Sequence, residues 1–291
     1  MAACDTKSRG GAWQCPWNTD GTLLAVADFQ GLEYDLWDTK SWTRKRHLSI
    51  PLSAAEKQIV RHLAPVGLSF DSHGNVYTAL PYTGWDGSVP QLLRAKVWWG
   101  GDSAVENSKS IGGCEGSVDV SVAPMGQETR VAISNENAKC TLEILRIQGP
   151  GGKRIVRREY ALTAVEAHGL NLARICLTND GKYLVGHDGF QLCVFELSDT
   201  QAKLVYSRPD KIATSMPGVL LHLFDVSLNG HFAAYGADHR IRVIKIPDGQ
   251  TALEIEQEPD SLALSPDGRL LALISRKRKS ILLYHVSQAQ K

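Results

Sequence analysis

The chain has 291 residues, and its 32 Lys and Arg against 31 Asp and Glu give a formal net charge of +1 at pH 7. Nucleic-acid-binding proteins typically have a strongly basic face, and a net charge of +1 gives no sign of one. We therefore expect no nucleic-acid partner. No apolar run approaches the ~20 residues that a membrane-spanning helix requires, and we expect no membrane partner.

The cysteines predict a reducing environment. They are scattered without a CxxC pair, so reduced thiols fit better than a disulfide framework or a zinc site. Residues 1–11, MAACDTKSRGG, lack the apolar core of a signal peptide. We therefore expect a cytoplasmic monomer without a bound metal. The six cysteines are Cys4, Cys15, Cys114, Cys140, Cys176 and Cys193.

A glycine-centred turn recurs six times along the chain. Each turn follows a short alternation of apolar and small residues, which has the period of a β-strand, and precedes an apolar run that predicts a second strand. Glycine accepts the positive φ that such turns need. Six repeats in 291 residues average about 48 residues each, and their shared register predicts a repeat architecture. The six glycines are Gly21, Gly74, Gly126, Gly181, Gly230 and Gly268. The third turn is expected over Ala123-Pro124-Met125-Gly126.

These repeats resemble those of WD40 β-propellers. Trp37-Asp38 ends a predicted third strand and is the dipeptide that names the family. In the fourth repeat, His168 lies where the family has its Gly-His histidine, and Asp188 occupies the tight turn between the second and third strands. Phe195 stands where tryptophan is usual, and the second, third and sixth repeats lack a matching turn aspartate. Asp28 and Asp238 fit that turn in the first and fifth repeats.

The resemblance implies an all-β fold: one closed β-propeller of six four-stranded antiparallel blades, with seven blades as the alternative. The single domain spans residues 1–291 and contains almost no helix. Residues 1–11 either extend freely or pair with the last blade and close the ring, which removes exposed sheet edges. The expected blades cover about residues 12–50, 65–110, 116–160, 169–210, 219–257 and 260–287.

In chain order, aromatic residues come first. The tryptophans of the first blade have strand spacing, which predicts packing between blades; they are Trp13, Trp17, Trp37 and Trp42. The second blade has an unusual loop, PYTGWDGSVP, over residues 81–90. Its Tyr82 and Trp85 lie between glycines and prolines, which favours a recognition surface, while packing of Trp85 on its own blade is the alternative.

The later blades add residues to the same face, which carries the turns between second and third strands. We predict that a protein or peptide binds there and that Trp85 with Arg240 contributes most of the affinity, because tryptophan and arginine are common interface hot spots. The predicted binding residues are Tyr82, Trp85, His187, Phe190, His239, Arg240 and Arg276.

Two further groups have structural interpretations. By the resemblance, His168 and Asp188 form a structural pair. Arg174, Asp119 and Asp225 lie on predicted innermost strands, where a water-filled channel would accommodate their charge.

No catalytic or cofactor motif is legible. Gly149-Pro150-Gly151-Gly152 matches neither a phosphate-binding loop nor a dinucleotide fingerprint, because no helix is expected to follow it. The sequence therefore predicts a WD40-like scaffold that binds a protein, a peptide or a small ligand and uses no cofactor. The alternative is a propeller enzyme, lactonase- or hydrolase-like or a biosynthetic cyclase, with a pocket at the channel mouth.

Overall fold

The structure of the protein is a computed structural model that describes part of the chain. The described residues are 18, 21–27, 33–49, 66–70, 76–82, 94–100, 107–113, 118–125, 128–135, 141–148, 154–160, 172, 174–187, 190–199, 201–210, 223–237, 239–257, 261–275 and 280–286.

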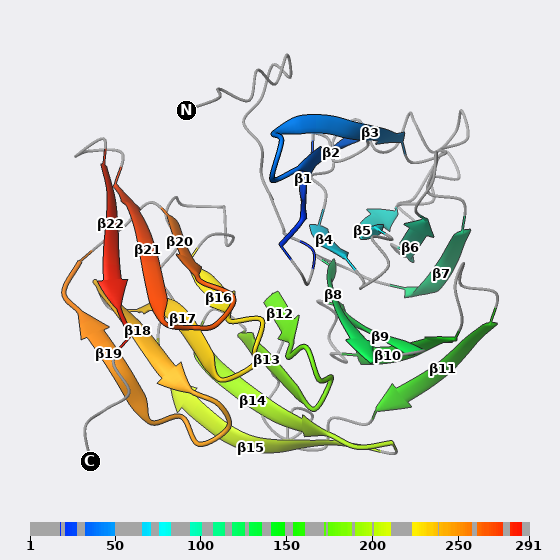
Figure 1. The fold of residues 1–291 in the computed structure, drawn as a ribbon. Coiled ribbons are helices and arrows are strands. Elements are labelled where there is room, and N and C mark those ends of the chain that lie inside the picture. The colour runs from blue at the N-terminus through cyan, green and yellow to red at the C-terminus, as the bar shows by residue number, and fades with distance from the viewer. Residues whose placement is uncertain are drawn as a thin grey trace, which may run out of the picture. The chain divides into compact units, whose positions relative to one another are not determined.

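All regular structure in these ranges is β-strand, arranged in six antiparallel sheets (Figure 1). Four sheets have four strands, and the first and last have three described strands each. The first three sheets contain β1 (Leu23–Ala27), β2 (Glu33–Asp38) and β3 (Thr43–Ser49); β4 (Val66–Phe70), β5 (Val76–Tyr82), β6 (Arg94–Gly100) and β7 (Asn107–Gly113); and β8 (Val118–Met125), β9 (Glu128–Asn135), β10 (Thr141–Gln148) and β11 (Arg154–Tyr160).

The last three sheets follow the same sequential order. They contain β12 (Arg174–Leu177), β13 (Tyr183–His187), β14 (Gln191–Leu197) and β15 (Ala202–Pro209); β16 (Phe224–Val226), β17 (Phe232–Ala237), β18 (Arg240–Lys245) and β19 (Thr251–Ile255); and β20 (Ser261–Leu264), β21 (Leu270–Ser275) and β22 (Ser280–His285).

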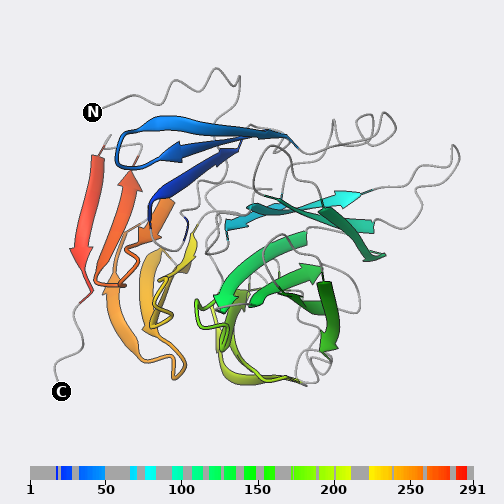
Figure 2. The same cartoon turned by 45° about the vertical axis from the view of Figure 1, so that its right-hand side comes forward.

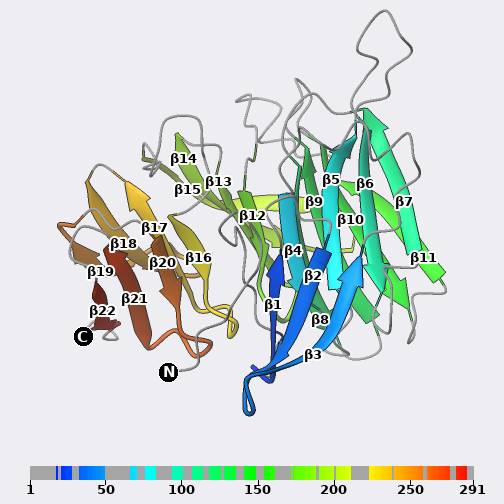
Figure 3. The same cartoon turned by 90° about the horizontal axis from the view of Figure 1, so that it is seen from above.

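The chain forms two compact units, Met1–Ala138 with Ile144–Arg157, and Lys139–Glu143 with Arg158–Lys291. The last three sheets belong to the second unit. Within it, the β16–β19 sheet packs against the β20–β22 sheet on one side, as Figures 1, 2 and 3 all show. On its other side it packs against the β12–β15 sheet.

Two apolar cores separate these three sheets. Successive side chains of a strand point to opposite faces, so β17 supplies Ala233 and Tyr235 to one core and Ala234 to the other. Every residue of β17 is buried, since apolar side chains are required on both faces of a sheet that lies between two others. The first core also contains Val185 and Val194, and the second contains Leu262, Leu271 and Leu273.

The glycine turns share one hydrogen-bond pattern. Before β13, the Thr178 Oγ1 donates to Asp180 Oδ1 at 2.6 Å and accepts from the Tyr183 N–H at 3.0 Å. The side chains of Ser227 and Asn229 repeat these contacts before β17, and those of Ser265 and Asp267 repeat them before β21. Before β1, Asn18 takes the place of the hydroxyl residue, and its Oδ1 accepts from the Leu23 N–H at 2.8 Å.

The predicted positive φ is confirmed at four of the six glycines, with φ values between 65° and 71° at Gly21, Gly181, Gly230 and Gly268. Gly74 and Gly126 lie outside the described residues. The turns of neighbouring sheets also touch: Asn229 donates its backbone N–H to Pro266 O at 3.0 Å. A Cβ on Gly230 would lie 2.8 Å from the Thr178 Cβ, whereas one on Gly21 would meet nothing within 4 Å.

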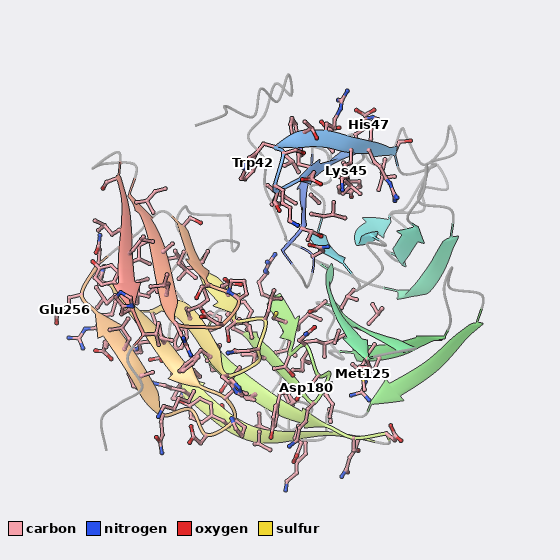
Figure 4. All side chains as sticks on the ribbon, in the orientation of Figure 1. Trp42, Lys45, His47, Met125, Asp180 and Glu256 are labelled. Carbon is pink, nitrogen blue, oxygen red and sulfur yellow. The ribbon has the colours of Figure 1, made fainter. Side chains whose placement is uncertain are left out.

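Two sequence expectations require correction. Ala123, Pro124 and Met125 were expected in the third glycine turn but belong to β8, since Met125 pairs directly with Glu128 of β9. Trp42, expected to pack between blades, lies in the turn between β2 and β3, where it adopts φ 53° (Figure 4). It is 48% exposed because it belongs to a turn rather than to a strand. The ring closure expected of residues 1–11 concerns residues outside the described ranges, and the blade number stays a prediction.

Gly21 and Gly230 share a positive φ but differ in their surroundings, which allows a direct test of contact between turns. Gly21→Ala should cost about 1–2 kcal/mol, because an alanine is strained at positive φ. Gly230→Ala carries the same strain and also forces the new Cβ against Thr178, so it should cost clearly more. Urea unfolding of both variants measures the difference, and equal losses would show that the turns of the β12–β15 and β16–β19 sheets do not depend on their close contact.

Candidate interaction surface

Two turns of the second unit carry the described candidates of the predicted face. Phe190 lies between β13 and β14 and is 73% exposed, the largest exposed fraction among the large apolar side chains of the described residues. His239 lies between β17 and β18; it is exposed and adopts φ 63°. Arg240 follows as the first residue of β18. The expected exposure is thus observed at Phe190 and His239.

The other candidates have different positions. Tyr82 is the last residue of β5 and belongs to the first unit, so its relation to the two turns above stays a prediction. Trp85 and Arg276 lie outside the described residues, as do His168 and Asp188 of the expected structural pair.

His187 does not belong to an exposed surface. Its side chain is 2% exposed and contacts the Phe224 ring edge-on, with ring centroids 5.2 Å apart. Burial, aided by the positive charge of Arg174 opposite it in the strand register, lowers the pKa of His187 to about 3. The imidazole is therefore neutral at pH 7 and packs between sheets. The expected exposure of His187 is not observed, because the residue still belongs to β13 rather than to the following turn, and its binding role stays a prediction from the sequence.

Arg240 is engaged in ion pairs rather than available as an isolated cation. Its Nη1 lies 2.7 Å from Glu254 Oε1, and its Nη2 lies 3.1 Å from Glu256 Oε1. Glu254 also accepts a hydrogen bond from Arg242 Nε at 3.0 Å. Arg242 and then Arg240 hold the pKa of Glu254 below its ordinary value. Glu256 is 80% exposed at the outer edge of this group (Figure 4).

Asp210 is the centre of a buried network below these turns. It directly follows β15 and is 7% exposed. Its Oδ1 accepts from Arg242 Nη1 at 2.8 Å, and its Oδ2 accepts from the Tyr235 hydroxyl at 2.8 Å. Arg208 Nε forms an ion pair with the same Oδ2 at 2.9 Å. Burial and the hydrogen bond to Asp210 raise the pKa of Tyr235. Since Tyr235 and Arg242 belong to β17 and β18, Asp210 joins two sheets.

The network also reaches the exposed turns. The Asp210 N–H donates to Phe190 O at 2.9 Å, which holds the backbone of Phe190 beside the end of β15. On the other side, Arg242 shares Glu254 with Arg240. A continuous set of contacts therefore runs from Phe190 through Asp210, Arg242 and Glu254 to Arg240.

Sequence reasoning missed Asp210, Arg242 and Tyr235. The available signal was Arg242 itself, a charged residue inside the apolar run IRVI. A strand buried on both faces accommodates a charge only if that charge is paired. The partner could not be found from the repeat, because Asp210 lies 32 residues earlier in another sheet.

Asp225 has a structural role in β16, which the sequence placed innermost in its blade. Its Oδ2 accepts the Leu264 N–H of β20 at 2.7 Å, and its Oδ1 accepts the Val226 N–H at 2.9 Å. Burial raises the pKa of Asp225 to about 6. The carboxyl group therefore joins two sheets through backbone hydrogen bonds, whereas the sequence suggested a group hydrated by channel water.

The described ranges contain neither a candidate metal centre nor a candidate membrane-spanning helix. No group of three or more His, Cys, Asp or Glu in them could hold a metal ion. Among the described cysteines, Cys176 and Cys193 form no disulfide. No helix in the described part of the chain has the length and hydropathy needed to cross a membrane.

The repeated antiparallel sheets and their glycine turns define a WD40-type β-propeller fold. Solved structures support this assignment. The β-propeller domain of Myceliophteria thermophila Cps50 (Swd1) is 16% identical with a TM-score of 0.53, covering 96% of this chain and 98% of that chain. A chain of the mitotic checkpoint complex is 13% identical with a TM-score of 0.58, covering 93% and 75%.

Another similar structure is hydrazine synthase from Kuenenia stuttgartiensis, which is 12% identical with a TM-score of 0.51 and full coverage of both chains. Identities this low show the fold alone. No model of a known protein family matches the chain, and no curated protein sequence matches it.

The buried imidazole predicts a specific pH dependence of stability. The pKa of His187 is lower in the folded state, so the unfolded state binds the extra proton. His187 therefore reduces stability as pH falls from about 6.5 towards 3. Relative to the wild type, His187→Gln should gain about 2.5 kcal/mol between pH 7 and pH 4.5, at about 1.36 kcal/mol per pH unit below 6.5.

Urea unfolding midpoints at the two pH values measure this change. The raised pKa of Asp225 changes stability in the opposite direction, but it does so in both proteins and cancels in the comparison. The exposed His285 supplies the control His285→Gln. A wild-type and His187→Gln difference that stays constant with pH would contradict the buried neutral imidazole.

Proposed function

We propose that this protein is a WD40-like interaction scaffold that binds a protein or peptide through the face carrying the second-to-third-strand turns. Propeller neighbours, one of them part of a multi-protein checkpoint complex, support a scaffold role. The observation that carries the choice of face is Phe190, a large apolar side chain that is 73% exposed on a turn anchored by a buried network.

The physical basis is pre-organisation. An exposed phenylalanine buries much apolar area on binding, and a turn that is already held by Asp210 loses little conformational entropy in the process. Arg240, Glu254 and Glu256 add paired charges of both signs near one end of the same network. Such charges select partners and orientation more than they add affinity.

The proposed surface also includes the sequence candidates Tyr82, Trp85, His239 and Arg276, with Trp85 and Arg240 as expected anchors. Its partner is a polypeptide rather than a nucleic acid, in keeping with the net charge of +1. A small ligand or an enzymatic pocket at the channel mouth stays the alternative prediction from the sequence.

The test compares the binding of two variants, each of which removes one exposed apolar side chain. Partners are captured from extracts of the source organism on immobilised protein, and each candidate is then titrated as a purified protein. Phe190→Ala should weaken a true partner at least about tenfold, as expected for an apolar anchor. Leu283→Ala is the control, because Leu283 is 67% exposed in a strand of another sheet.

Trp85→Ala and Arg240→Gln extend the same titration to the remaining anchors. A partner that binds Phe190→Ala as tightly as the wild type, while Leu283→Ala weakens it, would place the interaction on the β20–β22 sheet and refute the proposed face.

A further inference from the structure

A cavity of about 590 Å³ lies between the β16–β19 and β20–β22 sheets, at the strand ends that carry the glycine turns. One wall consists of the turn before β17 and the start of that strand, and the other consists of the turn before β21 and the end of β22. Its volume is in the range of small-molecule sites. The polar lining residues are Asn229, His231, Asp267, Arg269 and His285.

The two walls are fixed relative to each other. Asn229 donates through Nδ2 to Asp267 O at 2.7 Å and through its backbone N–H to Pro266 O at 3.0 Å. A Cβ on Gly268 would lie 2.5 Å from the Phe232 ring, so the β21 turn rests directly on β17. Phe232 and Val286 supply the apolar part of the lining. The cavity therefore has pre-formed walls.

The ionisable side chains favour an anion. Arg269 is 83% exposed, and its only ion pair among the described residues is a long contact of 3.7 Å to Asp267. Asp267 is engaged by its own turn, accepting from Ser265 Oγ at 2.6 Å and from the Arg269 N–H at 3.0 Å. The hydrogen bond from Ser265, followed by that from Arg269, lowers the pKa of Asp267.

The two imidazoles complete the donor set. Within the described part of the chain, neither the His231 ring nor the His285 ring makes a hydrogen bond, and both side chains are exposed at the cavity. A histidine ring always has at least one N–H to donate. A guanidinium presents a planar fork of donors that fits two oxygens of one anion.

We propose that this cavity binds a small anion with several oxygen acceptors, a phosphate or carboxylate group, held by Arg269, His231 and His285. The site lies at the opposite strand ends from Phe190 and Arg240, so it is independent of the proposed protein-binding face. The apolar wall of Phe232 and Val286 accommodates the uncharged remainder of such a ligand.

Calorimetric titration of the full chain with pyrophosphate, and separately with citrate, tests this proposal. We expect saturable binding of at least one anion, weakened about tenfold or more by Arg269→Gln and by the double variant His231→Ala with His285→Ala. Lys203→Gln is the control, because Lys203 is an exposed cation on the outer strand β15 and should bind like the wild type.

The two anions separate the possible sources. Tighter binding of pyrophosphate assigns a phosphate ligand, and tighter binding of citrate assigns a carboxylate. Thermal unfolding of each variant verifies that it is folded. The absence of saturable binding for both anions, or equal affinity of Arg269→Gln and Lys203→Gln, would overturn the proposal.

Discussion

The ion pair between Asp210 and Arg242 is the interaction on which the described surface of the second unit depends. Both side chains are almost fully removed from water, with exposed fractions of 6% and 9%. A charge in that position costs several kcal/mol unless its hydrogen-bonding capacity is met. Asp210 meets this condition with Arg242, Tyr235 and Arg208, and Arg242 also reaches Glu254. The cost of burial is thus offset by directional bonds that require one arrangement of two sheets.

This arrangement explains how Phe190 and Arg240 are held at the ends of their strands. Loops at strand ends are ordinarily the most mobile parts of a β-protein. Here the backbone of the Phe190 turn is bonded to Asp210, while Arg240 is joined to the same network through Glu254. At the opposite strand ends, the glycine turns are fixed differently, by hydrogen bonds of hydroxyl, amide and carboxylate side chains within the turn, and the turn before β17 also contacts the turn before β21. The same strands therefore present two structured ends with different chemistry.

The repeat made the strands and their turns predictable, because a turn such as Pro266-Asp267-Gly268 between apolar runs is determined by neighbouring residues. The strands β12, β16 and β20 and their glycine turns lie where the alternation placed them. Interactions between repeats were not predictable in this way. The pairing of Asp210 with Arg242 depends on packing of two sheets, and the burial of His187 depends on Phe224 from the next sheet. Exposure of Phe190 could be anticipated, but not the buried support below it.

A double-mutant cycle on Asp210 and Arg242 tests the central claim most directly. Asp210→Ala, Arg242→Ala and the double variant are compared with the wild type by urea unfolding. If the buried pair joins the sheets, each single change leaves an uncompensated charge and costs about 3–5 kcal/mol. The double variant should then cost well below the sum, with a coupling energy of about 2 kcal/mol or more. Additive losses within about 0.5 kcal/mol would contradict the account, because the two residues would then stabilise the protein independently.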